Sequence, residues 1–275
     1  MTASTTTAST RTAPSRAPRV VGLRGFPTLL AVEARVWLRE VGTVFFALAF
    51  PTVLLVGVGF AIPGMRDVLP AEAFGPEWEG RRMLDAYVPA VLAVAVATPA
   101  LTTMPVGFAT FRERGVLRRL STTPMRPQGI VLAHLVINLA ATVVATLLAL
   151  AVAIPLLGVV APANVAVVLL GFLLAVVAMY AIGTLVAARA PRAGTASAIG
   201  SLVYFPMMFF AGLWTPGPIM PDTVERVAQL TPLGAAAQMM GAGWQGEPFP
   251  ALQLVVLLLW TAVCLPLGVR LFRWT

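Results

Sequence analysis

The 275-residue sequence contains no lysine, a single cysteine and a single histidine. A phosphate-binding P-loop needs the lysine of its GxxxxGK[ST] pattern, so this chain cannot bind nucleotide in that way. Cys264 alone excludes an internal disulfide and a cysteine-based metal cluster, and His134 alone excludes a multi-histidine metal site within one chain. No carboxylate falls near the middle of a long apolar segment, as ion-coupled transporters usually require. We therefore predict no catalytic residue, no metal site and no cofactor in this chain.

Charged residues are also scarce. They make up 11% of the chain, against about 25% in a soluble domain, whereas 59% of the residues are hydrophobic. The apolar residues gather into segments of about the length that a helix needs to cross the hydrocarbon core of a membrane. These segments cover residues 42–62, 86–109, 130–158, 162–188, 196–215 and 249–269. We therefore predict an all-α integral membrane protein with six transmembrane helices.

The net charge of +8 predicts a topology, because the arginines lie at the ends of the apolar segments. They form no basic face with interleaved aromatics, so we expect no nucleic acid as a partner. With the N-terminus in the cytoplasm, the cytoplasmic segments carry 15 of the 19 arginines: Arg11, Arg16, Arg19, Arg24, Arg35, Arg39, Arg112, Arg114, Arg118, Arg119, Arg126, Arg189, Arg192, Arg270 and Arg273. The outer segments carry Arg66, Arg81, Arg82 and Arg226, together with eight of the eleven acids. The positive-inside rule then predicts an inner-membrane protein with both termini in the cytoplasm.

The N-terminal region divides into a tail and an amphipathic helix. Residues 1–22 are mainly Ser, Thr, Ala, Pro and Arg and are expected to form a disordered cytoplasmic tail before a membrane domain over 23–275. The next residues, 26–41, favour a helix that lies in the membrane interface. Its apolar stripe consists of Leu30, Ala34, Trp37, Leu38 and Val41. The alternative is a cytosolic helix packed on a partner.

The outer region between the fifth and sixth spans, residues 216–248, is too patterned for a simple loop. Asp222 and Glu225 have the spacing of a capping box, which predicts a short helix. Thr231 followed by Pro232 predicts the start of a second one. Neither is long enough to cross the membrane, so we predict an outer re-entrant helical hairpin that dips into the outer leaflet or caps the bundle.

Two polar residues of the third span, His134 and Asn138, share one helical face because they are four residues apart. Small polar groups in membrane spans commonly hydrogen-bond a neighbouring helix. We expect that role for this pair, and not a proton relay.

The largest predicted cytoplasmic loop joins the second and third spans and covers residues 110–129. From Phe111 to Gln128 it reads FRERGVLRRLSTTPMRPQ. After Gly115, apolar residues and arginines alternate as in a short amphipathic helix, which Pro124 would end. Such a helix could dock another protein. The alternative is a basic loop that rests on anionic lipid.

This loop resembles the corresponding loop in the permeases of type-2 ATP-binding-cassette (ABC) exporters, the family of daunorubicin-type drug exporters and of polysaccharide or lipid exporters. A second similarity covers Ala198 to Met240, which reads YFPMMFFAGLWTP in the fifth span and then PDTVERVAQLTPLGAAAQMM. The likeness extends over about residues 24–270 in order and spacing.

The resemblance implies a permease that works with a separate nucleotide-binding ATPase subunit, which would hold ATP and Mg. It also implies a second permease copy or a homologous permease in the lipid membrane. The cytoplasmic loop would carry a coupling helix that fits a cleft of the ATPase, with the coupling residues Arg112, Glu113, Arg114, Gly115, Leu117, Arg118 and Leu120. The pathway would lie between the second and fifth spans, lined by Thr98, Thr102, Tyr204, Met207, Met208, Phe210 and Trp214.

An aromatic and methionine-rich pathway suits a hydrophobic or amphipathic cargo, such as a drug, a lipid or a polysaccharide-like compound. The alternative for these side chains is that they face lipid or seal a dimer. The alternatives for the whole chain are an ATP-independent membrane channel or carrier, and a membrane assembly protein.

Overall fold

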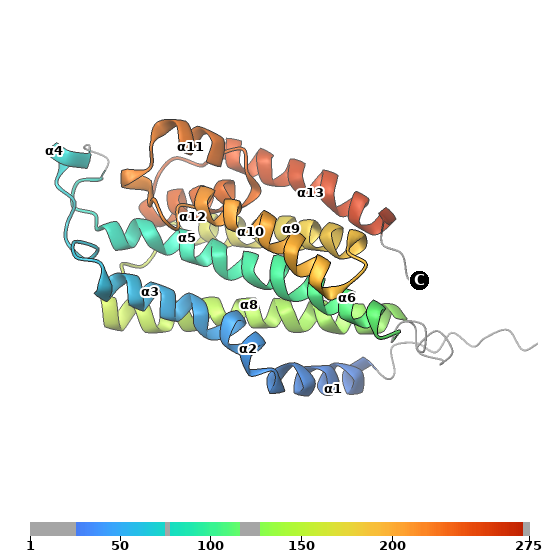
Figure 1. Cartoon of the computed structure of the whole chain (residues 1–275). Helices are drawn as coiled ribbons and strands as arrows, with labels where there is room; N and C mark the ends of the chain where they lie inside the picture. The colour runs from blue at the N-terminus through green and yellow to red at the C-terminus, as the bar shows by residue number, and fades with distance from the viewer. Residues whose placement is uncertain (1–25, 75–77, 116–126, 272–275) are drawn as a thin grey trace, which may run out of the picture.

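The computed structural model describes residues 26–74, 78–115 and 127–271. The predicted tail and most of the predicted coupling helix, with Leu117, Arg118 and Leu120, lie outside the described residues. The described chain consists of helices and connections, with one isolated bridge between Val68 and Arg82. Figure 1 shows the long helices lying roughly side by side.

Six spans in the described residues are long and apolar enough to cross a membrane, which confirms the predicted fold class. Their helices are α2 (Val41–Val44), η2 (Phe45–Ala49) and α3 (Phe50–Ala61); α5 (Met83–Thr98), η4 (Pro99–Thr103) and α6 (Met104–Glu113); α8 (Pro127–Leu157); α9 (Val165–Arg189); α10 (Ala193–Phe210); and α13 (Ala251–Leu271). The shorter helices are α1 (Phe26–Arg39), α4 (Ala71–Phe74), η5 (Gly217–Ile219), α11 (Asp222–Ala228) and α12 (Pro232–Gln245). We call the two ends of the bundle the α1 end and the α4 end, to the right and left in Figure 1.

The predicted span boundaries agree with the structure to within a few residues, with two exceptions. The second span runs from Met83 to Glu113, beyond the predicted 86–109, because its polar ends bind the ends of neighbouring helices. The fifth ends at Phe210, before the predicted residue 215. There Gly212 takes a left-handed backbone conformation, with a φ of 85°, which turns the chain out of the helix.

The second span, α5–η4–α6, is the core of the molecule, and we call it the central helix. All its residues from Tyr87 to Leu101 are buried, and most of them are small or β-branched. Helices α3 and α8 contact it, and α9, α10 and α12 contact it as well. In Figure 1 it runs through the middle of the bundle. A helix that is apolar on all sides is stable only when neighbours cover it completely, as they do here.

Helices α8 and α9 run in opposite directions, as a short connection around Gly158 requires, but they do not form a close-packed pair (Figure 1). Helix α8 packs mainly against α1, η2 and α3, whereas α9 packs mainly against α12 and α13. The central helix contacts both of them. The α8–α9 connection therefore passes over the end of the central helix, which lies between α8 and α9.

Two glycines bring neighbouring backbones into contact with the π-helical turn η4. A Cβ atom at Gly183 of α9 would overlap the carbonyl oxygen of Ala100, and one at Gly200 of α10 would overlap that of Leu101. Pro105 has no N–H to donate to the Leu101 carbonyl, and proline is a common cause of such local departures from the α-helix. Contacts between Cα–H groups and carbonyl oxygens recur where helices approach this closely.

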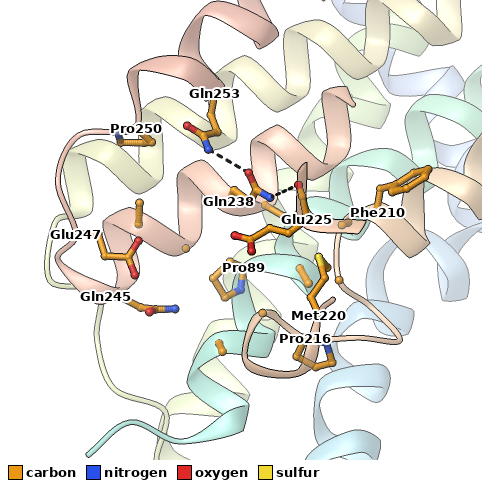
Figure 2. A pocket seen from close by; sticks show the side chains of 18 of the residues that line it. Pro89, Phe210, Pro216, Met220, Glu225, Gln238, Gln245, Glu247, Pro250 and Gln253 are labelled. Atoms are coloured by element: carbon orange, nitrogen blue, oxygen red, sulfur yellow. Dashed lines mark hydrogen bonds between the residues drawn. The ribbon is translucent and has the colours of Figure 1, made fainter. Parts of the chain in front are cut away.

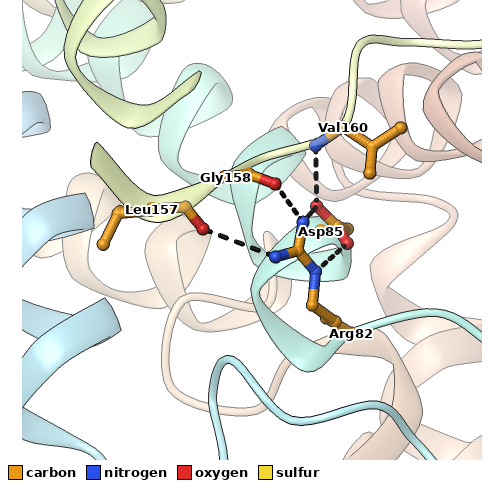
Figure 3. Close-up of polar contacts among 5 residues, drawn as sticks. All are labelled: Arg82, Asp85, Leu157, Gly158 and Val160. Carbon is orange, nitrogen blue, oxygen red and sulfur yellow. Dashed lines mark hydrogen bonds and ion pairs between the residues drawn. The ribbon is translucent and has the colours of Figure 1, made fainter. Parts of the chain in front are cut away.

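The α4 end of the central helix is fixed to the end of α8 by an ion pair (Figure 3). The Nε atom of Arg82 lies 3.0 Å from Oδ2 of Asp85, and the guanidinium donates to the carbonyl oxygens of Leu157, at 3.4 Å, and Gly158. Oδ1 of Asp85 accepts from the N–H of Val160 at 3.2 Å. The positive charge compensates the negative end of the helix dipole of α8. One ion pair thus orders both the end of α8 and the connection to α9.

Both predicted helices of this region are present: α12 begins as predicted, and α11 begins at Asp222 without the predicted capping box. The Thr231 hydroxyl accepts a hydrogen bond from the N–H of Gly234 at 3.2 Å, with Pro232 in the first turn. The predicted capping box at Asp222 is wrong: Pro221 is the N-cap, it makes no side-chain cap, and Asp222 is already helical. Helix α12 is largely buried and contacts α5, α9 and α13. Its place in the outer leaflet remains a prediction.

Helix α1 packs against α8 through only a part of its predicted apolar stripe. Trp37 is buried against Ile137 and Ala141 of α8. Leu38 and Val41, by contrast, are 58% and 78% exposed, so the stripe is narrower than predicted. Helix α1 thus lies against the first half of α8, and its position at the membrane surface remains a prediction.

We expect Gly200→Ala to destabilise the protein, because its Cβ would overlap the Leu101 carbonyl and overpacking costs about 1–3 kcal/mol. The matched control is Gly194→Ala on the same helix, where a Cβ meets no atom within 4 Å. Thermal unfolding in detergent should give a lower midpoint for the first variant only. Equal midpoints would contradict the close contact between α10 and η4.

Candidate functional site

A cavity of about 670 Å³ lies towards the α1 end of the molecule, between α1, η2, the central helix and α10. Its volume falls within the range of ligand pockets, roughly 300–1,000 Å³. The apolar lining includes Trp37, Phe46, Phe50, Phe205 and Met208. The hydroxyl lining includes Thr98, Thr102, Thr103, Thr110, Ser201 and Tyr204. We call it the inner cavity.

A hydrogen bond joins two of the residues that line the inner cavity. The hydroxyl oxygens of Thr98 and Tyr204 are 2.8 Å apart, and both side chains are buried. The Thr98 hydroxyl also donates to the carbonyl of Val94 at 2.8 Å, so the Tyr204 hydroxyl is the donor in the bond between them. This bond joins the central helix to α10 near the middle of the bundle.

Two carboxylates, Glu33 of α1 and Glu40 just after it, line the same cavity. Oε2 of Glu40 accepts from the hydroxyl of Thr43 at 3.1 Å. Burial raises the pKa of Glu33. Arg114, which is exposed, supplies a positive charge to the lining.

The structure brings together four of the seven predicted pathway residues. Thr98, Thr102, Tyr204 and Met208 all line the inner cavity. Met207 instead packs, half-buried, against the hydrophobic core.

The other two predicted pathway residues line separate cavities at the α4 end. Trp214 lines one of about 580 Å³ between α3, the start of α5 and residues 213–219, which we call the outer cavity. Phe210 lines one of about 330 Å³, shown in Figure 2. There Gln253 donates to Oε1 of Gln238 at 3.0 Å, and Gln238 donates to the backbone carbonyl of Glu225 at 3.4 Å.

The predicted coupling residues that the structure describes bind the turn between α9 and α10. Nη1 of Arg112 donates to the carbonyl oxygens of Ala187, at 3.1 Å, and Ala190, at 2.6 Å. Oε2 of Glu113 accepts from the N–H of Ala193 at 3.2 Å. The positive charge thus lies at the C-terminus of α9 and the negative charge at the N-terminus of α10, as the helix dipoles favour. The end of the central helix and the α9–α10 turn are therefore one unit.

The neighbouring Arg114 and Gly115 make no hydrogen bond with that turn among the described residues. Gly115 has a φ of 64°, a left-handed conformation that ends α6 at this point. Any coupling role of these two residues, and of the three outside the described residues, remains a prediction.

His134 and Asn138 differ from the expected interhelical hydrogen bond. Nδ2 of Asn138 donates to the carbonyl of His134 in its own helix at 2.8 Å. Among the described residues, Oδ1 of Asn138 and Nε2 of His134 are buried without a partner. The His134 ring packs against Phe108 and Phe111, with centroid distances of 5.5 and 5.6 Å, and lines the inner cavity. On this face of α8, Thr142 makes the interhelical contact, through its hydroxyl, with Tyr180 of α9.

Sequence reasoning missed Glu33 and Glu40 as cavity residues. They are seven residues apart, with Glu33 in α1 and Glu40 directly after its last residue. That spacing was a usable signal, but the helices that complete the cavity come from much later in the chain.

A comparison with protein families gives one result that covers most of the chain. A family model described as "ABC-2 type transporter" matches residues 24–244. The match includes the inner cavity and the junction between α6 and the α9–α10 turn. The search of curated proteins found no match.

We expect Thr98 and Tyr204 to be energetically coupled. A double-mutant cycle of Thr98→Val and Tyr204→Phe should give a coupling energy of about 0.6 kcal/mol, typical of hydrogen bonds between membrane helices. The free energy of unfolding would be measured in mixed detergent micelles. The control cycle replaces Thr98→Val by Thr110→Val, because the Thr110 hydroxyl donates to the Val106 carbonyl within its own helix. A coupling energy equal to that of the control would contradict the bond.

We expect Arg112→Gln to loosen the α9–α10 turn. Hydrogen bonds to charged groups contribute roughly 1.5–3 kcal/mol, so amide hydrogen exchange over residues 186–196 should accelerate about tenfold or more. Arg189→Gln, at an exposed position beside the same turn, should leave the exchange rates unchanged. Unchanged rates in the Arg112 variant would mean that this residue does not hold the turn.

Proposed function

Because this chain belongs to the ABC-2 type transporter family, we propose that it is the membrane-spanning permease subunit of an ATP-driven exporter. The cargo is a hydrophobic or amphipathic compound that occupies the inner cavity. ATP and Mg²⁺ bind to a separate ATPase subunit, and this chain carries no catalytic residue. A second permease, identical or homologous, completes the pathway.

The observation that carries this proposal is that the central helix extends from the inner cavity to the α9–α10 turn. Its middle lines the inner cavity through Thr98 and Thr102, and its end holds the α9–α10 turn through Arg112 and Glu113. The chain then continues directly into the connection of residues 110–129. Force applied to that connection would therefore reach the cavity wall through one continuous helix.

The charges at the two ends of the bundle support an orientation with both termini in the cytoplasm. Described arginines at the α1 end are Arg35, Arg39, Arg112, Arg114, Arg189, Arg192 and Arg270. Described acids at the α4 end are Asp67, Glu72, Glu79, Asp85, Asp222, Glu225 and Glu247. By the positive-inside rule, the α1 end lies on the cytoplasmic side of the inner membrane. The inner cavity then receives cargo from the cytoplasm or the inner leaflet.

In the proposed cycle, ATP binding closes the ATPase subunits against the 110–129 connection. The central helix and the α9–α10 turn move together, because Arg112 and Glu113 join them. Separation of the first span from the central helix and α10 would connect the inner cavity with the outer cavity, which lies further along the same three spans. Exposed apolar side chains on α10, with Leu202 75% exposed, offer a surface for the second permease.

We expect the tagged chain, purified from its native membrane in mild detergent, to recover a subunit that hydrolyses ATP. Arg118→Glu reverses a charge in the predicted coupling helix and should lower the recovered ATPase activity severalfold. Arg226→Glu makes the same charge change on α11 at the α4 end and should not. The proposal fails if no ATPase is recovered, or if purified chain alone moves cargo across liposomes without nucleotide.

A further inference from the structure

The inner cavity carries an unusual charge for its position. The α1 end of the molecule is strongly basic, and the sequence places only three acids there: Glu33, Glu40 and Glu113. Glu113 is engaged at the N-terminus of α10. The two others both line the cavity. Two of the three acids of this end therefore line one cavity.

Neither carboxylate is neutralised within the described residues. The ion pairs among those residues are Arg81–Glu247 and Arg82–Asp85, both at the α4 end. Glu40 accepts one hydrogen bond, from the Thr43 hydroxyl, and Glu33 has no recorded hydrogen-bond partner in this part of the chain. With the single cation Arg114, the charged lining of the cavity carries a net charge of about −1 when both carboxylates are ionised.

His134 is a further polar residue of the cavity wall. His134 is only 9% exposed, lines the cavity, and has a buried Nε2 atom without a partner among the described residues. This atom lies against Gly107 of the central helix, so the imidazole forms part of the cavity wall.

The other side chains that line the cavity are largely apolar. Phe46, Phe50 and Phe205 offer aromatic rings, and Met208 offers a polarisable side chain. Aromatic faces attract organic cations, and methionine adapts to ligands of varied shape. The lining therefore combines an apolar surface with carboxylates at the end that α1 forms.

We propose that the inner cavity binds an amphipathic organic cation, with its apolar body among the phenylalanines and its positive group near Glu33 and Glu40. This inference rests on the proposed function, because it assigns the chemical class of the cargo. Helix α1 is then a part of the binding site, and not only a membrane anchor. An anionic amphipath held by Arg114 is the competing outcome of the test.

The test compares two probes of nearly the same shape and opposite charge, tetraphenylphosphonium and tetraphenylborate. Binding to the full chain is measured in nanodiscs of zwitterionic lipid, with empty nanodiscs subtracted. Wild-type protein should bind the phosphonium more tightly than the borate. Glu33→Gln combined with Glu40→Gln should weaken phosphonium binding about tenfold or more, because two nearby charges are lost.

Two further variants keep the result interpretable. Arg114→Gln removes the cation of the lining and should strengthen phosphonium binding, whereas a folding defect would weaken it. Glu72→Gln removes an exposed carboxylate on α4 and should have no effect. Equal binding of the two probes, tighter binding of the borate, or a phosphonium affinity that survives loss of both carboxylates would overturn the proposal.

The two proposals fail separately. A chain that recovers an ATPase but shows no preference for the cation retains the permease function and loses only the assigned cargo class. A chain that binds the cation but recovers no ATPase retains the binding site and loses the ATP-driven mechanism.

Discussion

An arginine near each end of the central helix donates to backbone carbonyls at the end of a neighbouring helix. At the α4 end, Arg82 binds the last carbonyls of α8, and at the α1 end Arg112 binds those of α9. The last carbonyls of a helix have no partner within it and carry the negative end of its dipole. Each arginine therefore satisfies a backbone requirement and fixes the position of a whole span. The arrangement of the other helices depends on these two attachments, because the central helix contacts most of them.

The same attachments relate the cavity to the rest of the molecule. A buried helix held at both ends responds to force as one body, and its middle residues, Thr98 and Thr102, line the inner cavity. The opposite wall belongs to α1 and the start of the first span. The cavity is thus bounded by the most enclosed helix of the bundle and by the helix that precedes the first span.

Much of the fold could be predicted from the sequence, because apolar runs of the right length fix the number of membrane spans. The start of α12 was also predictable, since Thr231 and Pro232 act within one helical turn. The capping box at Asp222 was not, because Pro221 took the N-cap position that the spacing assigned to its neighbour. Local patterns state what a residue can do, and the flanking backbone decides which of the possibilities occurs.

The candidate site was predictable only in part, for a different reason. Thr98 and Tyr204 were found because the two spans that carry them were paired by the resemblance. Glu33 and Glu40 were missed because the helices that complete the cavity around them come from much later in the chain. Similarly, Arg82 and Arg112 were counted as topology signals, although each also binds a helix end. Contacts between segments distant in the sequence decide such roles, and no pattern within one segment records them.

The glycine contacts at η4 have a mechanical consequence. Gly183 and Gly200 hold α9 and α10 against the central helix, backbone to backbone, with no side chain between them that could change rotamer. These three helices therefore make a rigid body, to which Arg82 also attaches the end of α8, whereas α1 and α3 meet it through side chains that can slide or repack. The seam of lowest resistance runs between these two groups, and the inner cavity lies along that seam. A hinge-like separation of the two groups would widen or empty the cavity without breaking any helix.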